Sequence, residues 1–385
     1  YTSQYTLSLH DALPIWDDLN VGSELRLTNG TLSQANSETL TLSSGSTVRR
    51  SNGTLGFTPS FGTTVNVTYT AGLTTGAELS SSNTGTLTVD ATGETVMLAT
   101  STNPTLQGDL TIQNGTFNDN GNTLVVNGNA TVDDTHVSTS GGQLTFTGGS
   151  STHTLAGSGT YGTVELNESG DVTGAEATIS KGATVGTLTA TDGVLEVQSS
   201  GATVSGGVTV DSELQLAGAL DVGGDLTVNG TLAGGAQTVT LNGSSAQTLG
   251  GTGASLSLGS LTLNNSNGAT LEADLSIAGT LALTNGILSR SGDQTLTMQD
   301  GSTLQVGTGS TGFAPTYNGT ASLIYTTGTT TGSELTSPSL NTLEVDASGQ
   351  TVTLAADANP TVGGALTITS GTLDLNGNDV TLTGS

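Results

Sequence analysis

Few residues of this sequence have the types and spacing that catalysis needs. The string "DDTH", Asp133 to His136, is the one place where paired carboxylates adjoin a histidine. Carboxylates beside a histidine can serve as general acid and base in polysaccharide hydrolysis. No Gly-His-Gly or Arg-x-Lys string accompanies them, so we expect an exposed turn. Lys181 in "ISKGATV" stands alone, and we expect a solvated turn lysine there rather than the base of a lyase.

Three short strings partly match metal-binding patterns. "NDNGN", residues 118–122, and "DLNGND", residues 374–379, hold oxygen ligands of a calcium loop but lack its terminal Glu. "GGTGAS", residues 250–255, has the glycines of a calcium-binding repeat without its Asp. His136 and His153 have no companion ligands, so they do not predict a zinc site. We expect no catalytic, cofactor-binding or metal-binding residue, and Ca²⁺ stays open as an ion that so acidic a chain could attract.

A long internal repeat organises the chain. "LRLTNGTLS" from Leu25 returns as "LALTNGILS" from Leu281, and the match continues at a constant offset of 256 to the end of the sequence. About half of the positions are identical. A fixed long period is the signature of a repeat architecture. We therefore predict one complete unit over residues 25–280 and a second, truncated unit over residues 281–385. Landmarks shared by both copies are Phe57/Phe313, Pro59/Pro315, Tyr69/Tyr325, "TTGAEL" with "TTGSEL" (74–79, 330–335) and "NPT" (103–105, 359–361).

The two copies share little that could bind a ligand. They have no basic residue and no histidine in common, and a repeated site would be expected to repeat its ligands. Tyr69 and Tyr325 could contact a sugar, although packing explains them better. Asp90 in "TVDATG" is expected to end a strand with an Asx-type turn. The carboxylates kept in both copies are Glu78/Glu334 and Asp90/Asp346.

A weaker repeat concerns a polar position. "GSSTHTLAGSG", residues 149–159, resembles "GSSAQTLGGTG", residues 243–253. His153 stands where the other string has Gln247. The position therefore requires a polar side chain rather than a histidine.

The first 16 residues differ in character from the rest and hold the only tryptophan. Tyr5 to Ile15 matches, without a mismatch, the translation of a common short-read sequencing adapter, and the adapter's last base is compatible with Trp16. We therefore interpret residues 1–16 as adapter read-through and exclude them from reasoning about the fold.

Composition excludes several functional classes. The chain has no Cys, 5 basic and 32 acidic residues, and a formal net charge of −27. Binding to nucleic acid or to anionic membranes needs clustered Lys and Arg, so we expect neither. No apolar run reaches the roughly 18 residues of a membrane span. Aromatic residues make up 3%, which suits a thin interior filled by aliphatic side chains.

Short segments with alternating apolar and polar residues predict an all-β fold. "DLTVNGTL" places Leu226 and Val228 on one side and Thr227 on the other, as in a half-buried strand. Asn-Gly pairs mark sharp turns. We predict a parallel β-helix (β-solenoid) with coils of roughly 20 residues stacked at about 4.8 Å. Tandem antiparallel β-sandwich domains are the alternative. The segments 56–79 and 312–335 fit the coil pattern least and are expected to project as a hairpin or loop.

Phrases such as "DLTVNGTLAGGAQTVTLNG" (225–243) and "GTLDLNGNDVTLTG" (371–384) carry a family resemblance. The chain resembles large secreted bacterial repeat proteins, namely filamentous-haemagglutinin-like and autotransporter-passenger-like β-solenoids. The resemblance implies a structural or adhesive, non-catalytic protein located outside the cell or on its surface. Surface glycans and host or matrix proteins are the partners it implies. The alternative function is a spacer in a large secreted carbohydrate-active enzyme.

Overall fold

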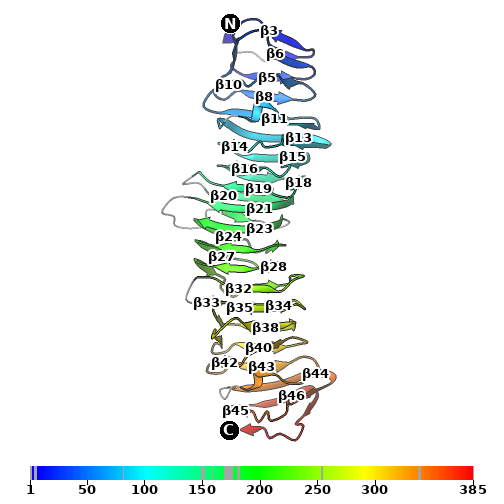
Figure 1. Cartoon of the computed structure of the whole chain (residues 1–385), viewed down its shortest axis with the longest axis vertical. Coiled ribbons are helices and arrows are strands. Elements are labelled where there is room, and N and C mark those ends of the chain that lie inside the picture. The colour runs from blue at the N-terminus through cyan, green and yellow to red at the C-terminus, as the bar shows by residue number, and fades with distance from the viewer. Residues whose placement is uncertain are drawn as a thin grey trace. The chain divides into compact units, whose positions relative to one another are not determined.

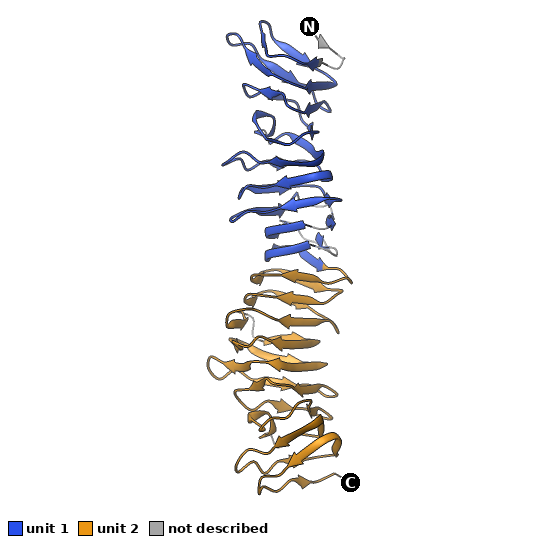
Figure 2. Cartoon of the chain, turned by 90° about the vertical axis from the view of Figure 1, so that its right-hand side faces the viewer, with its two compact units in different colours: residues 1–196 blue, residues 197–385 orange. Residues whose placement is uncertain are grey.

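The computed structural model describes residues 2–3, 7–80, 82–148, 152–157, 159–168, 177–179, 183–252, 255–336 and 340–384. The chain is all-β, with 56% of the described residues in strands and 2% in helix. Parallel strands stack coil on coil in a β-solenoid of about 18 turns (Figure 1). The predicted fold is confirmed, and the alternative of tandem antiparallel sandwiches is wrong. The coils form two compact units, Tyr1–Glu196 and Val197–Ser385 (Figure 2).

In the first unit, one strand of each coil joins a continuous parallel ladder. Leu87 pairs with Leu110, which pairs with Ala130, so a coil takes about 20 residues as predicted. The described strands of this ladder are β2 (Leu7–Leu9), β5 (Glu24–Leu27), β8 (Thr47–Arg50), β11 (Val65–Tyr69), β13 (Thr84–Met97), β15 (Leu110–Asn118), β17 (Ala130–Val132), β20 (His153–Gly157) and β22 (Ala177–Ile179).

Other strands of the same coils form the remaining walls. In one coil, β4 (Leu19–Val21), β5 and β6 (Thr31–Gln34) each join a different sheet. Farther along the first unit, β16 (Thr123–Val126), β19 (Gln143–Phe146), β21 (Gly159–Asn167) and β23 (Ala183–Asp192) pair in succession, again in parallel.

The second unit repeats this construction. Leu261 pairs with Leu281, which pairs with Leu304. Its main ladder consists of β25 (Ala202–Val204), β28 (Leu220–Val222), β31 (Thr238–Leu241), β34 (Ser260–Asn264), β37 (Thr280–Asn285), β40 (Thr303–Val306), β43 (Ser322–Tyr325), β44 (Thr342–Thr353) and β46 (Leu366–Asp374). A second wall runs through β26 (Val208–Val210), β29 (Leu226–Val228), β32 (Gln247–Gly250), β35 (Ala269–Leu271), β38 (Ile287–Arg290) and β41 (Ser310–Thr311). A third joins β33 (Ser255–Leu258), β36 (Asp274–Ile277), β39 (Leu296–Met298) and β42 (Thr316–Tyr317).

Alternate residues of each strand fill the interior. β5 buries Leu25 and Leu27 and exposes Arg26, and β31 buries Val239 and Leu241. Full burial of one such side chain is worth about 1.5–3 kcal/mol. Leu and Val therefore supply most of the core, as the alternating pattern predicts.

Asp and Asn side chains join successive coils at the corners. Asp274 Oδ1 accepts a hydrogen bond from the backbone N–H of Thr295 at 2.7 Å, and Asp300 Oδ1 accepts one from that of Thr320 at 2.7 Å. These bonds satisfy backbone groups that the ladders do not reach. The backbone N–H of Thr320, followed by its hydroxyl, holds the pKa of the Asp300 carboxyl below its ordinary value. Part of the acidic composition thus has a structural role.

The segment 56–79 is a regular coil, and the expected hairpin or loop is wrong. Its strand β11 pairs in parallel with β8 on one side and β13 on the other, and Tyr69 is fully buried. In the copy over 312–335, β43 lies between β40 and β44 and Tyr325 is buried. Of the aromatic residues that set these segments apart, Tyr69, Phe313, Tyr317 and Tyr325 are core residues, and Phe57 and Phe61 pack against the core while partly buried.

The strand β13 does not end at Asp90, contrary to expectation. Its register with β15 shifts at Asp90, where residues 91–94 bulge opposite Gly115. At Gly115 φ is +88°, and an added Cβ would lie 2.1 Å from the carbonyl oxygen of Ala91. The second copy keeps the bulge in β44 and the glycine at Gly371. The position is a β-bulge that requires glycine, rather than a strand end.

The sequence repeat and the compact units divide the chain differently. β8 and β40 begin at residues 47 and 303, a spacing of 256, so described strands recur with the sequence. The division into compact units falls after residue 196, and the repeat boundaries stay a prediction from sequence. The adapter interpretation of residues 1–16 also stays a prediction. Within them, β2 and β3 (Leu13–Ile15) pair with β5 and β6, and Trp16 is 71% exposed.

Candidate functional site

A glutamate is buried in the core of each copy. In the first copy Glu78 lies in the short 3-10 turn η1 (Ala77–Leu79) and is fully buried. Its Oε1 accepts hydrogen bonds from the Tyr69 hydroxyl at 2.6 Å, the Gly76 N–H at 2.8 Å and the Arg50 guanidinium. Burial, and then the Glu78 carboxylate, raise the pKa of Tyr69 well above its ordinary value. The phenol therefore stays protonated and acts as a donor.

The second copy keeps the glutamate and its tyrosine and glycine donors, with the Gly332 N–H 2.6 Å from Glu334 Oε1, but it lacks the arginine. Glu334, in η2 (Ser333–Leu335), accepts a hydrogen bond from the Tyr325 hydroxyl at 2.9 Å. The arginine of the first copy is replaced by Val306. Two hydroxyls contact Glu334 in this copy: Thr311 lies 3.5 Å from its Oε2, and Tyr317 donates to its backbone carbonyl, rather than to its carboxylate, at 2.9 Å.

Both clusters are closed to solvent and act as structural ties. Each joins a strand of one coil to the 3-10 turn that follows it. Tyr69 and Tyr325 are therefore core residues, and the alternative of a sugar contact is wrong for both. Sequence reasoning singled out the shared glutamates but could not show their burial.

The "DDTH" string divides between surface and core. Residues 133–134 are exposed, as expected of a turn. His136 lies in β18 (Thr135–Val137) and is only 2% exposed, so the expectation that it belongs to an exposed turn is wrong. Its Nδ1 donates to the Thr160 carbonyl at 2.9 Å. The ring stacks on Tyr161 at 4.4 Å between centroids and lies 5.8 Å from the Phe117 ring. Burial lowers the pKa of His136, so the core favours the neutral imidazole.

His153 and Gln247 confirm the predicted polar position. Both are buried. His153 Nδ1 donates to the Gly128 carbonyl at 2.7 Å, and its Nε2 lies 2.7 Å from Glu168 Oε1. Gln247 Nε2 donates to the Val222 carbonyl at 2.9 Å. A buried polar group needs such partners, and either side chain supplies the donor to the preceding coil.

The strings that resemble calcium loops use their oxygens internally. Asp119 Oδ1 accepts hydrogen bonds from the backbone N–H groups of Gly121 at 3.0 Å and Thr139 at 3.2 Å. Asp374 Oδ1 accepts one from the Asn376 N–H at 2.9 Å. Among the described residues, no group of three or more His, Asp or Glu side chains is placed to hold a metal ion. These strings are turns that their own carboxylates close.

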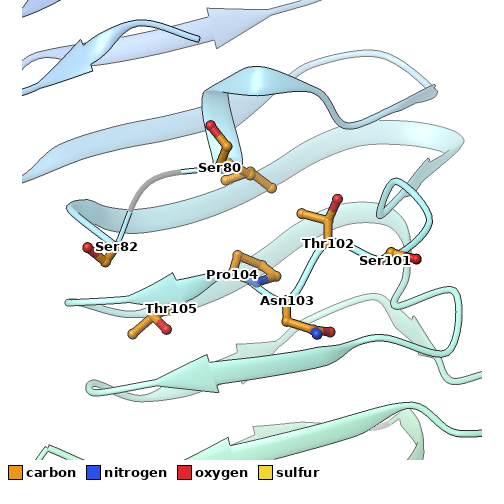
Figure 3. A pocket seen from close by; sticks show the side chains of 8 residues that line it. Ser80, Ser82, Ser101, Thr102, Asn103, Pro104 and Thr105 are labelled. Atoms are coloured by element: carbon orange, nitrogen blue, oxygen red, sulfur yellow. The ribbon is translucent and has the colours of Figure 1, made fainter.

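Two surface pockets occur at the same place in both copies. The N-terminal pocket, of about 360 Å³, lies beside η1 and the start of β14 (Thr105–Leu106) (Figure 3). The C-terminal pocket, of about 250 Å³, lies beside η2 and β45 (Thr361–Val362). The residues that line the C-terminal pocket each stand 256 positions after a residue that lines the N-terminal pocket. The linings are Leu79, Ser80, Ser82, Ser101, Thr102, Asn103, Pro104 and Thr105, and Leu335, Thr336, Asp357, Ala358, Asn359, Pro360 and Thr361.

Hydrogen bonds to the scaffold fix the polar groups of the N-terminal pocket. The Ser80 hydroxyl donates to the Ala77 carbonyl at 2.7 Å, which leaves its oxygen as an acceptor. Asn103 Oδ1 accepts from the Thr123 N–H of the next coil at 2.9 Å. Because a backbone N–H only donates, this bond assigns the amide orientation and leaves Asn103 Nδ2 as a donor. Ser80 and Asn103 are both exposed.

The C-terminal pocket has the same arrangement. Thr336 donates to the Ser333 carbonyl at 2.8 Å, as Ser80 does to its own turn. Asn359 Oδ1 accepts from the Asp379 N–H at 2.9 Å. Asn359 Nδ2 also donates one hydrogen to the Asp357 carbonyl at 3.5 Å, and its second hydrogen remains a donor. A fixed acceptor and a donor thus recur in both copies.

A left-handed backbone also recurs at the rim of each pocket. Ser101 and Asp357 both have φ of 61°. Left-handed residues other than glycine are uncommon. A second pair, Asn120 and Asn376, is explained by the scaffold, because each side chain donates to a carbonyl of the preceding coil. For Ser101 and Asp357, no side-chain hydrogen bond to another described residue takes this role.

Some sequence predictions concern residues whose structure is not described. Lys181 and residues 253–254 of "GGTGAS" lie outside the described residues. Among the described residues, no helix has the length and apolar character needed to cross a membrane.

The fold defines the chain as a β-solenoid repeat protein, which is the fold that the resemblance implied. Compared with protein-family models, curated proteins and solved structures, the chain matches none of them. The twin pockets are the candidate functional site that rests on the structure. The sequence did contain their signal, since "NPT" and "TTGAEL" with "TTGSEL" are landmarks shared by the copies.

Proposed function

We propose that the chain is a non-catalytic structural or adhesive repeat protein that acts outside the cell or on its surface. The observation that carries the proposal is the parallel β-solenoid, in which aliphatic side chains face inward and hydroxyl and amide side chains face outward on successive coils. Such a scaffold presents ordered, repeated surface groups, which suits contact with other surfaces.

The placement of the candidate catalytic residues supports a non-catalytic role. General acid–base catalysis needs titratable groups within reach of one substrate. Residues 133–134 lie at the surface, whereas His136 is packed between aromatic rings. The carboxylates of residues 133–134 and the His136 imidazole therefore lie in different environments, the former at the surface and the latter in the core.

The extracellular location rests on sequence arguments. The likeness to filamentous-haemagglutinin-like and autotransporter-passenger-like proteins supports it. The absence of cysteine is compatible with export, and the net charge of −27 favours solubility.

A flow assay tests the proposal. Beads carrying the chain are passed over surfaces coated with neutral glycans or with matrix proteins, and retention is compared with that of beads carrying Leu110→Asp. Leu110 is fully buried in β15, so a charge there should disrupt the coils. The variant differs from the parent chain by a single residue, so it serves as an unfolded control of nearly the same composition.

Three outcomes are informative. Retention above that of the Leu110→Asp variant on any surface supports an adhesive role. Absence of retention, together with protease resistance that the variant lacks, supports a purely structural role. Release of reducing sugars from a polysaccharide by the purified chain contradicts both.

A further inference from the structure

We propose that the twin pockets are binding sites for a neutral sugar residue, one site in each copy of the repeat. The inference rests on the proposed adhesive function and assigns it a ligand class and a place. Its first support is recurrence, because the same lining positions form a pocket in both units. The volumes are near or just below the lower end of the roughly 300–1,000 Å³ typical of small-molecule sites.

The charge of the linings excludes ionic ligands. No Lys, Arg or His lines either pocket, so phosphate, sulfate or an acidic sugar would have no counter-charge. A carboxylate lines only the C-terminal pocket, at Asp357, where the N-terminal pocket has Ser101. A cation would therefore find different ligands in the two copies.

The hydrogen-bonding groups suit hydroxyls. Each pocket offers a fixed acceptor, the side-chain oxygen of Ser80 or Thr336, and a fixed donor, the amide nitrogen of Asn103 or Asn359. A sugar hydroxyl both donates and accepts. In Figure 3 the Ser80 hydroxyl and the Asn103 amide lie on opposite sides of the N-terminal pocket and point away from each other, so they would contact separate hydroxyls of a sugar. These side chains are already held by the scaffold, which reduces the entropy lost on binding.

The apolar residues of each lining are buried. Leu79 is 1% exposed and Leu335 2%, and Pro104 and Pro360 are buried as well. They offer a ligand little surface, so recognition rests on the polar groups of the lining.

The rim residues Ser101 and Asp357 complete the site. A left-handed backbone would be less strained with glycine, which other positive-φ positions of both copies carry, for example Gly93 and Gly349. Both rim residues instead have a side-chain oxygen that can accept a hydrogen bond. We infer that these oxygens contact the ligand.

Ligand-observed saturation-transfer NMR on the full chain tests the inference. The probes are methyl glycosides of neutral hexoses, a deoxyhexose and N-acetylhexosamines, with glucuronate and a sialoside as anionic comparisons. A second set of measurements uses neutral oligosaccharides. Comparing their binding with that of the monosaccharide glycosides shows whether the pockets take free sugars or residues of a glycan chain. We expect at least one neutral probe to bind, with a Kd on the order of 1 mM, and the anionic probes not to bind.

Variants locate the binding. Ser101→Gly with Asn103→Ala should remove the N-terminal site and about half of the bound probe, and Asp357→Gly with Asn359→Ala should do the same for the other site. Each glycine substitution alone should weaken its site by roughly fivefold, the effect of one lost hydrogen bond, and should leave the urea midpoint no lower, because it relieves backbone strain. Asn52→Ala, an exposed residue outside both pockets, serves as the control.

Two results would overturn the inference: no neutral probe binds, or the variant with all four substitutions binds as well as the parent chain. If beads carrying that variant are still retained in the flow assay, the pockets are not the adhesive sites and the proposed function stands. If the beads lose retention while the urea midpoint is unchanged, the inference and the proposed function are both supported.

Discussion

Arg50 and Val306 occupy the same position in the two copies, and the groups around them show how a buried charge is accommodated. Arg50 is 3% exposed and pairs with the fully buried Glu78. Where valine replaces arginine, Thr311 and Tyr317 replace Leu55 and Phe61. Thr311 lies 3.5 Å from Glu334 Oε2 and Tyr317 donates to the Glu334 backbone carbonyl, so both added hydroxyls contact the glutamate that lacks a cation, and we treat the three exchanges as one set.

Replacing Arg50 by valine should therefore destabilise the first unit strongly. Arg50→Val leaves Glu78 buried without its cation, which should cost about 3 kcal/mol. Adding Leu55→Thr and Phe61→Tyr reproduces the second copy's set and should restore part of the loss. Urea unfolding gives the free energies.

The neighbouring arginine provides the control for this change. Arg49 is 38% exposed and pairs with Glu24 at 3.0 Å, so Arg49→Val should cost less than about 1 kcal/mol. Equal losses for Arg49→Val and Arg50→Val would contradict the role assigned to the buried pair.

At the scale of elements, three strands of successive coils carry one column of rings. Phe117 in β15, His136 in β18 and Tyr161 in β21 are all buried, and each ring contacts the next. Asp119 is the charged group that acts on His136, and Thr160 accepts its Nδ1 proton. The column makes the packing of three coils depend on one imidazole.

The column should make the first unit sensitive to mild acid. Burial lowers the pKa of His136 below the ordinary 6.5, so below pH 6.5 the unfolded chain takes up a proton that the folded chain does not. The contribution of the neutral His136 to the free energy of unfolding is complete above pH 6.5 and is lost as the pH falls through the folded pKa. The free energy of unfolding changes by at most about 1.4 kcal/mol per pH unit over this range. Urea midpoints between pH 5 and pH 8 measure it. His136→Phe keeps the ring and should flatten this part of the profile, and an unchanged profile would contradict the assignment.

How far sequence predicts an element depends on where its partners lie. Alternation within a strand is local, so the sequence predicts that Leu226 and Val228 share one side of their strand, and both are buried. The bulge after Asp90 and the burial of His136 are set by neighbours one coil away. The pockets could not be predicted for the same reason, namely that contacts one coil away determine their geometry. The orientation of the Asn103 amide, for example, is fixed by the Thr123 N–H, 20 residues later. A single sequence shows that "NPT" recurs but not which of its atoms are free.

At the scale of the whole molecule, charge is the dominant property. Acidic residues outnumber basic ones by 32 to 5. In the part of the chain that the structure describes, the ion pairs of arginine join Arg26, Arg49 and Arg50 to two glutamates. Most carboxylates therefore repel one another, and corner bonds such as that of Asp300 to Thr320 offset only part of the repulsion.

Salt should therefore stabilise the chain without a requirement for calcium. Raising NaCl from 0.01 M to 0.15 M shortens the screening length from about 30 Å to about 8 Å, which should raise the free energy of unfolding by on the order of 1 kcal/mol. CaCl₂ and MgCl₂ at equal ionic strength should act alike, because the calcium-like strings at 118–122 and 374–379 use carboxylate oxygens in their own turns. Urea unfolding after EDTA treatment, with each salt added back, makes the comparison. A rise with Ca²⁺ that Mg²⁺ does not match would instead reveal a dedicated calcium site, because binding to the folded state alone stabilises it by mass action.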